Sequence, residues 1–254
     1  MQLRLVPFLL VLGVRAGAVT LYEHTDANDP LAEGWAEAIP FQQVSVGPVF
    51  DDLGSGFDAW AVDDDGTASG DAGFYEGTLT AGEAADSETG GWTLSARLRS
   101  VDVPDPDGGG PVLGADAAPF VSYRDGATTW QLHFQTEAND DLTVYLATDF
   151  DMIDGLTHTV VGGALDYHLY ELAFDPGTGL AALSVDGAEV ITGYPGAPFV
   201  NAPPRVVFGS GTSAATGHGN FNLVRFELPV PEPSAPLLVL VGAGILAGAS
   251  RMRR

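Results

Sequence analysis

The alternating segment 130–135 carries side chains that could bind a carbohydrate. Gln131, His133 and Gln135 alternate with apolar residues, and Tyr145 occupies a polar position of the similar segment 142–147. Amide and imidazole groups hydrogen-bond to sugar hydroxyls, and an aromatic ring can stack on a sugar face. These four residues are therefore candidates for a glycan-binding face. The competing interpretation is an ordinary strand face that contacts only water.

Two arginines form a second candidate set. Arg97 and Arg99 alternate with apolar residues in segment 92–99, so an extended chain presents both on one face. They are two of only five basic side chains between residues 19 and 234, all of them arginine. Paired guanidinium groups suit the carboxylates of an anionic polysaccharide. The alternative is an internal salt bridge, because the chain has 34 acidic residues.

Aspartates gather at two places that could bind calcium, which prefers oxygen ligands. The first cluster is Asp63, Asp64, Asp65 and Asp71, and the second is Asp149, Asp151 and Asp154. Asp63, Asp65 and Asp71 are the candidate ligands, and Ca²⁺ is the one cofactor that the sequence suggests. Neither cluster completes the Asp-x-Asp-x-Asp-Gly loop with its distal glutamate. Solvated acidic loops are the alternative.

The common spacings of catalytic residues are absent from the sequence. None of the eleven glutamates has an aspartate two residues later, the spacing that would place two glycosidase carboxylates on one strand face. There is no Gly-x-Ser-x-Gly, the five histidines lack metal-ligand spacing, and there is no cysteine. The sequence therefore predicts no catalytic residues and a protein that is not an enzyme.

The composition limits the class of partner and the kind of fold. The 254 residues have a formal charge of −24, which repels phosphate backbones and argues against nucleic-acid binding. Glycine (33 residues) and proline (17 residues) are abundant, while charged residues make up only 17% of the chain. This composition favours short strands joined by turns over long helices.

Several segments show the period of two that is typical of half-buried antiparallel strands. The segments 92–99, 130–135 and 142–147 alternate in this way, and the last two flank the polar Asn139-Asp140-Asp141, which predicts a hairpin. Trp92 and Trp130 fall on apolar faces and are expected in the core. Without a linker or a long helical period, residues 19–228 are expected to form one all-β domain, a two-sheet antiparallel jelly roll with almost no helix.

Residues 1–18 have the features of a secretory signal peptide. Arg4 precedes the apolar run 5–14, and Ala16-Gly17-Ala18 has the small-x-small form that signal peptidase accepts. The apolar run is too short to span a bilayer. We expect cleavage after Ala18 and export of the protein.

The C-terminal segment 229–254 contains three elements in order. Pro231-Glu232-Pro233 precedes the uncharged run 235–250, and the chain stops after Arg251, Arg253 and Arg254. This segment resembles the PEP-CTERM sorting signal. The resemblance implies an apolar helix recognised by an exosortase-type sorting enzyme, a transient anchor in the inner membrane, and delivery to the cell surface or extracellular matrix of a bacterium. The terminal arginines agree with a cytoplasmic C-terminus.

Segments of the body resemble the concanavalin-A-like or laminin-G-like sandwich. The resemblance rests on "YHLYELAFDPGTGLAALSVDGAEV" (167–190), "VVFGSGTSAATGHGNFNLVRFEL" (206–228) and the early strands around 59–80 and 91–103. It implies a jelly-roll fold, which supports lectins, glycosidases and adhesion modules alike. The expected function is an exported surface protein whose non-catalytic sandwich binds polysaccharide. An exported glycan-processing enzyme, either a glycosidase or a lyase, and a purely structural surface protein are the alternatives.

Overall fold

The computed structural model describes residues 17–38, 44–64, 73–101, 119–137, 139–149, 155–199, 203–210 and 217–230. The chain divides into two compact units, one formed by Thr20–Leu228 and the other by the two chain ends, Met1–Val19 with Pro229–Arg254. In the unit of the chain ends, the described residues include Gly17 and Val230, whose carbonyl and amide are hydrogen-bonded at 2.8 Å. The signal segment 1–16 and the sorting segment 231–254 lie outside the described residues.

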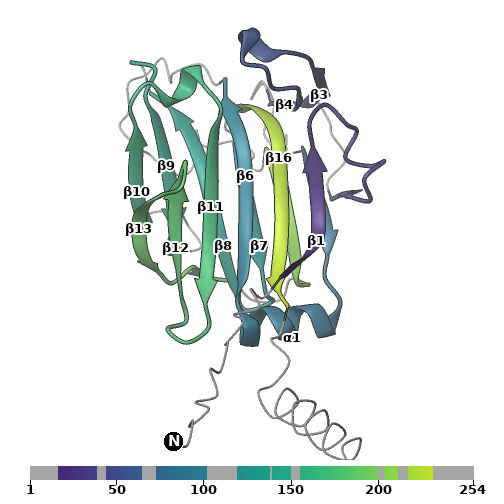
Figure 1. Ribbon diagram of the computed structural model, residues 1–254, viewed down its shortest axis with the longest axis vertical. Coiled ribbons are helices and arrows are strands. Elements are labelled where there is room, and N and C mark those ends of the chain that lie inside the picture. The colour runs from purple at the N-terminus through teal and green to yellow at the C-terminus, as the bar shows by residue number, and fades with distance from the viewer. Residues whose placement is uncertain are drawn as a thin grey trace, which may run out of the picture. The chain divides into compact units, whose positions relative to one another are not determined.

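The unit Thr20–Leu228 is a sandwich of two antiparallel sheets, shown as two layers in Figure 1. Sheet A has the order β13-β12-β11-β6-β16-β4-β3, with β1 pairing β16. Its strands are β1 (Ala18–Thr25), β3 (Val44–Val49), β4 (Ala59–Asp64), β6 (Trp92–Ser100), β11 (His168–Asp175), β12 (Leu180–Val185), β13 (Ala188–Tyr194) and β16 (Gly217–Pro229).

Sheet B has the order β10-β9-β8-β7-β15-β5-β2, with β14 pairing β8. Its strands are β2 (Ala36–Glu37), β5 (Gly73–Thr78), β7 (Pro119–Arg124), β8 (Thr128–Thr136), β9 (Leu142–Ala147), β10 (Gly155–Val160), β14 (Ala197–Pro198) and β15 (Arg205–Ser210). The predicted hairpin is confirmed, because β8 and β9 pair with His133 opposite Tyr145. The prediction of an all-β, two-sheet antiparallel sandwich is confirmed as well.

The core lies between the sheets and is rich in aromatic side chains. Trp92 and Trp130 are 3% and 4% exposed, as their positions on apolar faces predict. Their rings meet edge to face at 5.2 Å, and Tyr123 packs against Phe226 at 4.5 Å between centroids. Such pairs contribute about 0.5–1.5 kcal/mol each beyond the burial of their area. Because alternate residues of every strand are committed to this core, the remaining residues form two outer faces.

One helix departs from the expectation of an almost helix-free body. α1 (Ala81–Gly90) lies at the lower end of the sheets in Figure 1. Thr80 and Glu83 form a capping box, in which each side chain binds the backbone amide of the other residue. Capping satisfies amides that the first turn leaves unpaired, and it stabilises a helix by about 1 kcal/mol. Short 3-10 turns occur at η1 (Asp52–Gly54) and η2 (Gly163–Leu165). No helix in the described part of the chain has the length and apolarity needed to cross a membrane.

Candidate functional site: the two outer faces of the sandwich

The outer face of sheet B brings together the residues first suspected of binding a glycan. Their neighbours along the strands, such as Leu132, Phe134 and Val144, point into the core. Directly paired residues form rows across this face: Arg205, Arg124 and Thr129 in one row, Val207, Ser122 and Gln131 in the next, and Phe120, His133 and Tyr145 in the third. Gln135 pairs with Thr143 one row further on.

His133 is held in a defined orientation at the centre of this face. Its Nε2 lies 2.8 Å from the Oε1 of Gln131, and its ring stacks on Phe120 at 5.7 Å between centroids. The carbonyl oxygen of Gln131 accepts, so in the neutral imidazole the proton sits on Nε2 and Nδ1 is the basic nitrogen. His133 and Tyr145 are 4% and 2% exposed, whereas Gln131 is half-buried. The register therefore places a base and a phenol next to each other in an enclosed position.

Two arginines lie side by side at the edge of the same face. Arg205 pairs across the strands with Arg124 and forms an ion pair with Glu76. The Arg124 guanidinium lies 4.3 Å from the ring centroid of Phe199. Burial, together with repulsion by Arg205, lowers the pKa of Arg124 to about 10. Within the described part of the chain, no carboxylate lies within ion-pair distance of Arg124, so this corner of the face has an excess of positive charge.

Three buried polar atoms in these rows make no hydrogen bond. They are Ser122 Oγ, Arg124 Nε and Arg205 Nε. Buried polar groups are nearly always paired, because an unsatisfied donor costs about 1–3 kcal/mol. Unsatisfied donors beside two like charges therefore require an explanation, such as a water molecule, an ion or a catalytic role.

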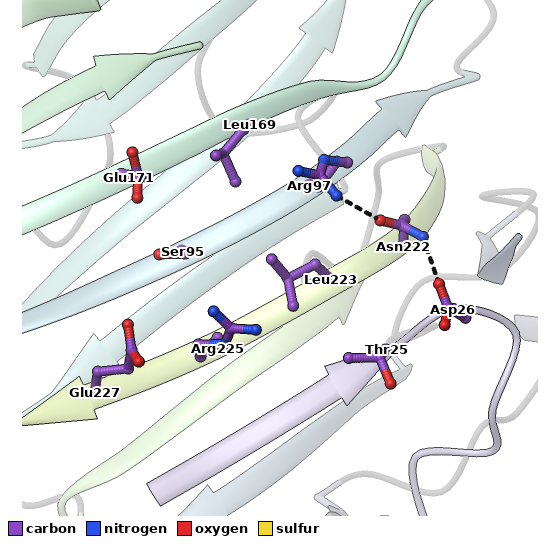
Figure 2. A pocket seen from close by; sticks show the side chains of 10 residues that line it. All are labelled: Thr25, Asp26, Ser95, Arg97, Leu169, Glu171, Asn222, Leu223, Arg225 and Glu227. Carbon is purple, nitrogen blue, oxygen red and sulfur yellow. Dashed lines mark hydrogen bonds between the residues drawn. The ribbon is translucent and has the colours of Figure 1, made fainter. Parts of the chain in front are cut away.

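The outer face of sheet A holds a groove of about 330 Å³ formed by β11, β6, β16 and the end of β1, shown in Figure 2. Most of its lining is polar and carries both signs of charge: Thr25, Asp26, Ser95, Arg97, Leu169, Glu171, Asn222, Leu223, Arg225 and Glu227. Arg97 donates to the Oδ1 of Asn222, whose amide donates to Asp26, and Arg225 forms an ion pair with Glu23. The arginines of this face are therefore matched by acceptors from the protein itself.

Arg99 lies further along β6, next to a second groove of about 370 Å³ that also contains Asp63 and His218. Its Nε and Nη2 donate to the carboxylate of Asp52 at 2.7 and 2.8 Å. The Asn220 amide and the Tyr167 hydroxyl donate to the same carboxylate at 2.7 and 3.0 Å. Burial on its own would raise the pKa of Asp52, but these hydrogen bonds outweigh it and the pKa is lowered.

The predicted sites thus lie on two different sheets. One face of sheet B carries Gln131, His133, Gln135 and Tyr145. One face of sheet A carries Arg97 and Arg99, and Arg99 forms the internal salt bridge that was the alternative interpretation of the sequence. The Oδ1 of Asp63 lies 3.6 Å from the Nδ1 of His218. The aspartates of the two clusters that lie outside the described residues are Asp65, Asp71, Asp151 and Asp154. Among the described side chains there is no group of three acidic or histidine residues placed to hold a metal ion.

Arg124, Arg205 and Ser122 were missed by the sequence analysis. Nothing in the sequence marks them, because their adjacency depends on the pairing of β7 with β15, two strands far apart in the chain. The available signal was the rarity of arginine: these are two of the five arginines between residues 19 and 234. Rarity alone does not single them out, because Arg97, Arg99 and Arg225 also lie at outward positions of strands and are matched by acceptors from the protein itself.

Comparison with solved structures finds the same fold in carbohydrate-related proteins. A conserved carbohydrate esterase from Shiga toxin-encoding bacteriophage phi24B is 18% identical, with a TM-score of 0.58 over 84% of this chain and 100% of that chain. An endo-β-1,4-glucuronan lyase from the fungus Trichoderma reesei is 13% identical, with a TM-score of 0.52 over 83% of this chain and 96% of that chain. At this identity the likeness shows the sandwich fold. No protein-family model and no curated protein sequence matches the chain.

These neighbours correct the prediction that the protein is not an enzyme. That prediction rested on absent sequence spacings, but chains of the same fold include an esterase and a lyase. The missing Glu-x-Asp and Gly-x-Ser-x-Gly spacings argue against two particular arrangements of hydrolytic residues. They do not argue against a site assembled across strands, such as the rows of sheet B.

Proposed function

We propose that this protein is an exported glycan-processing enzyme, a lyase that cleaves a uronate-containing polysaccharide on the outer face of sheet B. The observation that carries the proposal is the row order. On one face an oriented imidazole and a phenol occupy paired positions, and two rows away lies an arginine that has no carboxylate within ion-pair distance among the described residues. The known activity of the glucuronan lyase that shares the fold supports the same substrate class.

The reaction proposed is elimination across C4 and C5 of a uronate unit. Gln131 donates to the carboxylate of the reacting unit and offsets the negative charge that develops when the C5 proton leaves, and Arg124 binds the carboxylate of a neighbouring unit. Nδ1 of His133 accepts that proton, the electron pair of the C5–H bond forms the C4=C5 double bond, and the C4–O4 bond breaks. The Tyr145 phenol donates its proton to the departing O4. The products are a shortened chain and an unsaturated uronate end.

The spacing of these groups fits a polysaccharide that lies across the rows. Gln131 and His133 lie one row apart, about 7 Å along the strand, whereas Arg124 and His133 lie two rows and therefore four residues apart, about 13 Å, which is more than the length of one sugar unit. His133 and Tyr145 are directly paired, a position that places Cβ atoms about 4.5–5.5 Å apart. Arg124 and Gln131 are partly exposed, so the substrate approaches from their side of the face. His133 is buried, which excludes water from the proton transfer.

The location proposed for this activity is outside the cell. The signal segment 1–18 and the Pro231-Glu232-Pro233 segment with its arginine end support export by signal peptidase and sorting by an exosortase-type enzyme. In this proposal the protein is anchored transiently in the inner membrane and then reaches the cell envelope or the extracellular matrix. A body that carries five arginines against 34 acidic residues suits a soluble domain in that environment.

The test is product formation from polymers of known charge. Purified protein is incubated with polyglucuronate, polygalacturonate and alginate, and with a neutral β-glucan as the control. We expect ultraviolet absorbance from new C4=C5 double bonds with at least one uronate polymer and none with the neutral glucan. Reducing ends released without a double bond would show hydrolysis, and no cleavage of any uronate polymer would contradict the proposal.

A further inference from the structure

The segment 50–58, here called the strap, lies against the outer face of sheet A between the two grooves. The first groove reaches Arg97 on β6 and Asn222 on β16, and the second includes Arg99 and Asn220 further along the same strands. The strap is hydrogen-bonded to β16 beside each of the two grooves. The amide of Asn222 donates to the carbonyl of Asp58, and Asn220 donates to Asp52.

The strap is held together mainly by its own hydrogen bonds. The amide of Asp52 donates to the carbonyl of Phe57, the amide of Gly56 donates to the side chain of Asp51, and the amide of Asp51 donates to Asp58. Compact surface loops of this kind, packed by their own side chains, are frequently functional. Among the described residues, most of the hydrogen bonds between the strap and the rest of the domain end on a single carboxylate, that of Asp52.

The carboxylate of Asp52 occupies a set of hydrogen-bond donors that forms a receptor for an acidic group. Asp52 is 7% exposed and accepts four hydrogen bonds, two from Arg99, one from Asn220 and one from Tyr167. A bidentate guanidinium with an amide and a phenol is a donor set that fits any carboxylate, including that of a uronic acid. The three donors come from β6, β16 and the residue before β11, so they do not depend on the strap for their positions.

The strap is also under conformational strain and exposes apolar side chains. Asp51 and Leu53 have φ angles of 44° and 53°, a left-handed region that non-glycine residues adopt only at a cost in free energy. Phe50 and Leu53 are 71% and 75% exposed. The docked position of the strap is maintained by the bonds to Asp52, by the bond from Asn222 to Asp58 and by Phe57, whose ring centroid lies 5.2 Å from that of Tyr167 and 5.0 Å from the Arg97 guanidinium.

We propose that Arg99, Asn220 and Tyr167 form a second carboxylate-binding site, which Asp52 fills in the free protein and which a uronate of the polysaccharide fills after it displaces the strap. This inference rests on the proposed substrate class but not on the lyase chemistry of the opposite face. The site holds a sugar chain and does not cleave it. Because the strap competes with the ligand, the apparent affinity is the affinity of the open site reduced by the fraction of open molecules.

The first test removes the carboxylate of Asp52 and asks whether added glucuronate takes its place. Asp52→Ala removes the competing group, and sodium D-glucuronate is added with equal ionic strength of sodium chloride or with D-glucose as controls. We expect glucuronate at about 100 times its dissociation constant to raise the melting temperature of Asp52→Ala by about 5 °C. The rise in the unaltered protein should be smaller, because Asp52 still occupies its site.

The double variant Asp52→Ala/Arg99→Gln identifies the site. It retains the arginines of sheet B, so any glucuronate effect that remains comes from elsewhere. We expect the glucuronate-dependent rise to be lost. An equal rise in the double variant, or an equal rise with D-glucose, would overturn the proposal.

A second measurement covers the case in which Asp52→Ala does not fold. Hydrogen exchange of Gly54, Ser55, Gly56 and Phe57 is followed in His133→Ala protein with oligoglucuronate, a background chosen so that the probe is not cleaved. Displacement of the strap predicts several-fold faster exchange at these amides and no change in β6. Unchanged or slower exchange of the strap at the highest oligoglucuronate concentration would contradict the proposal.

Discussion

The two outer faces of the sandwich use the same side chains in opposite ways. On sheet A, Arg99 is bound by Asp52, and Arg225 by Glu23. On sheet B, Arg124 and Arg205 lie together with Glu76 as the one carboxylate in ion-pair contact within the described residues. In an acidic chain a carboxylate is easy to supply, so a guanidinium without one is the better indicator of a ligand. The charges on sheet A are matched within the free protein, and in the proposed function the unmatched charge on sheet B binds substrate.

The largest expected effect is on turnover, from the histidine of sheet B. His133→Ala removes the proposed base and should reduce the rate of product formation by about 10²–10⁴-fold. The matched control is His168→Ala, which removes a histidine of sheet A that pairs with Asp186 and lies outside both proposed sites. Its turnover should stay close to that of the unaltered protein. Equal losses of turnover in the two variants would contradict the placement of the catalytic base on sheet B.

The next effect is on stability, from the arginine of sheet A. Arg99→Leu leaves the carboxylate of Asp52 buried without its main partner, which should lower the free energy of unfolding by about 3–5 kcal/mol. Arg124→Leu, on sheet B, should lower it far less or raise it, because Arg124 is buried beside another cation. Denaturant titration of both variants measures the difference. A larger loss for Arg124→Leu would reverse the assignment of structural and functional arginines.

A third effect separates substrate binding on the two faces. Arg124→Gln should raise KM for a uronate polymer by about 10-fold or more, because charge-assisted hydrogen bonds contribute about 1.5–3 kcal/mol. Arg225→Gln, which breaks an exposed ion pair with Glu23, should leave KM nearly unchanged. Steady-state kinetics at fixed salt gives both values. An unchanged KM in Arg124→Gln would mean that this guanidinium does not meet the carboxylate.

The smallest expected effect is on stability at acidic pH, from Glu33. Glu33 accepts hydrogen bonds from His24, Thr25 and Asn28, and although burial alone would raise its pKa, these contacts lower it. A carboxyl whose pKa is lowered on folding adds stability above its ordinary pKa, and that stability is lost as the pH falls below about 4. Glu33→Gln should therefore cost about 1 kcal/mol at pH 7 and less at pH 3. Melting curves across this range check the sign, and a larger cost at pH 3 would contradict it.

Much of the fold follows from the period-two alternation in the sequence. The alternation in segments 130–135 and 142–147 is enough to predict the hairpin and the shared face of His133 and Tyr145. Helix α1 was missed because its low apolar content hides it, although Thr80 and Glu83 have the spacing of a capping box. The arginine pair and the receptor around Asp52 could not be predicted, because each joins residues brought together only by strand pairing or loop docking.

The most direct test of the account is to locate an acidic sugar chain on the protein. A crystal structure of His133→Ala with oligoglucuronate would show which face binds it. The account predicts a uronate carboxylate within hydrogen-bond distance of Gln131, with C5 of that sugar facing the position of residue 133, and the carboxylate of a neighbouring uronate within hydrogen-bond distance of Arg124. A chain bound on sheet A alone, with Arg124 and Gln131 unoccupied, would contradict the assignment of sheet B as the active face.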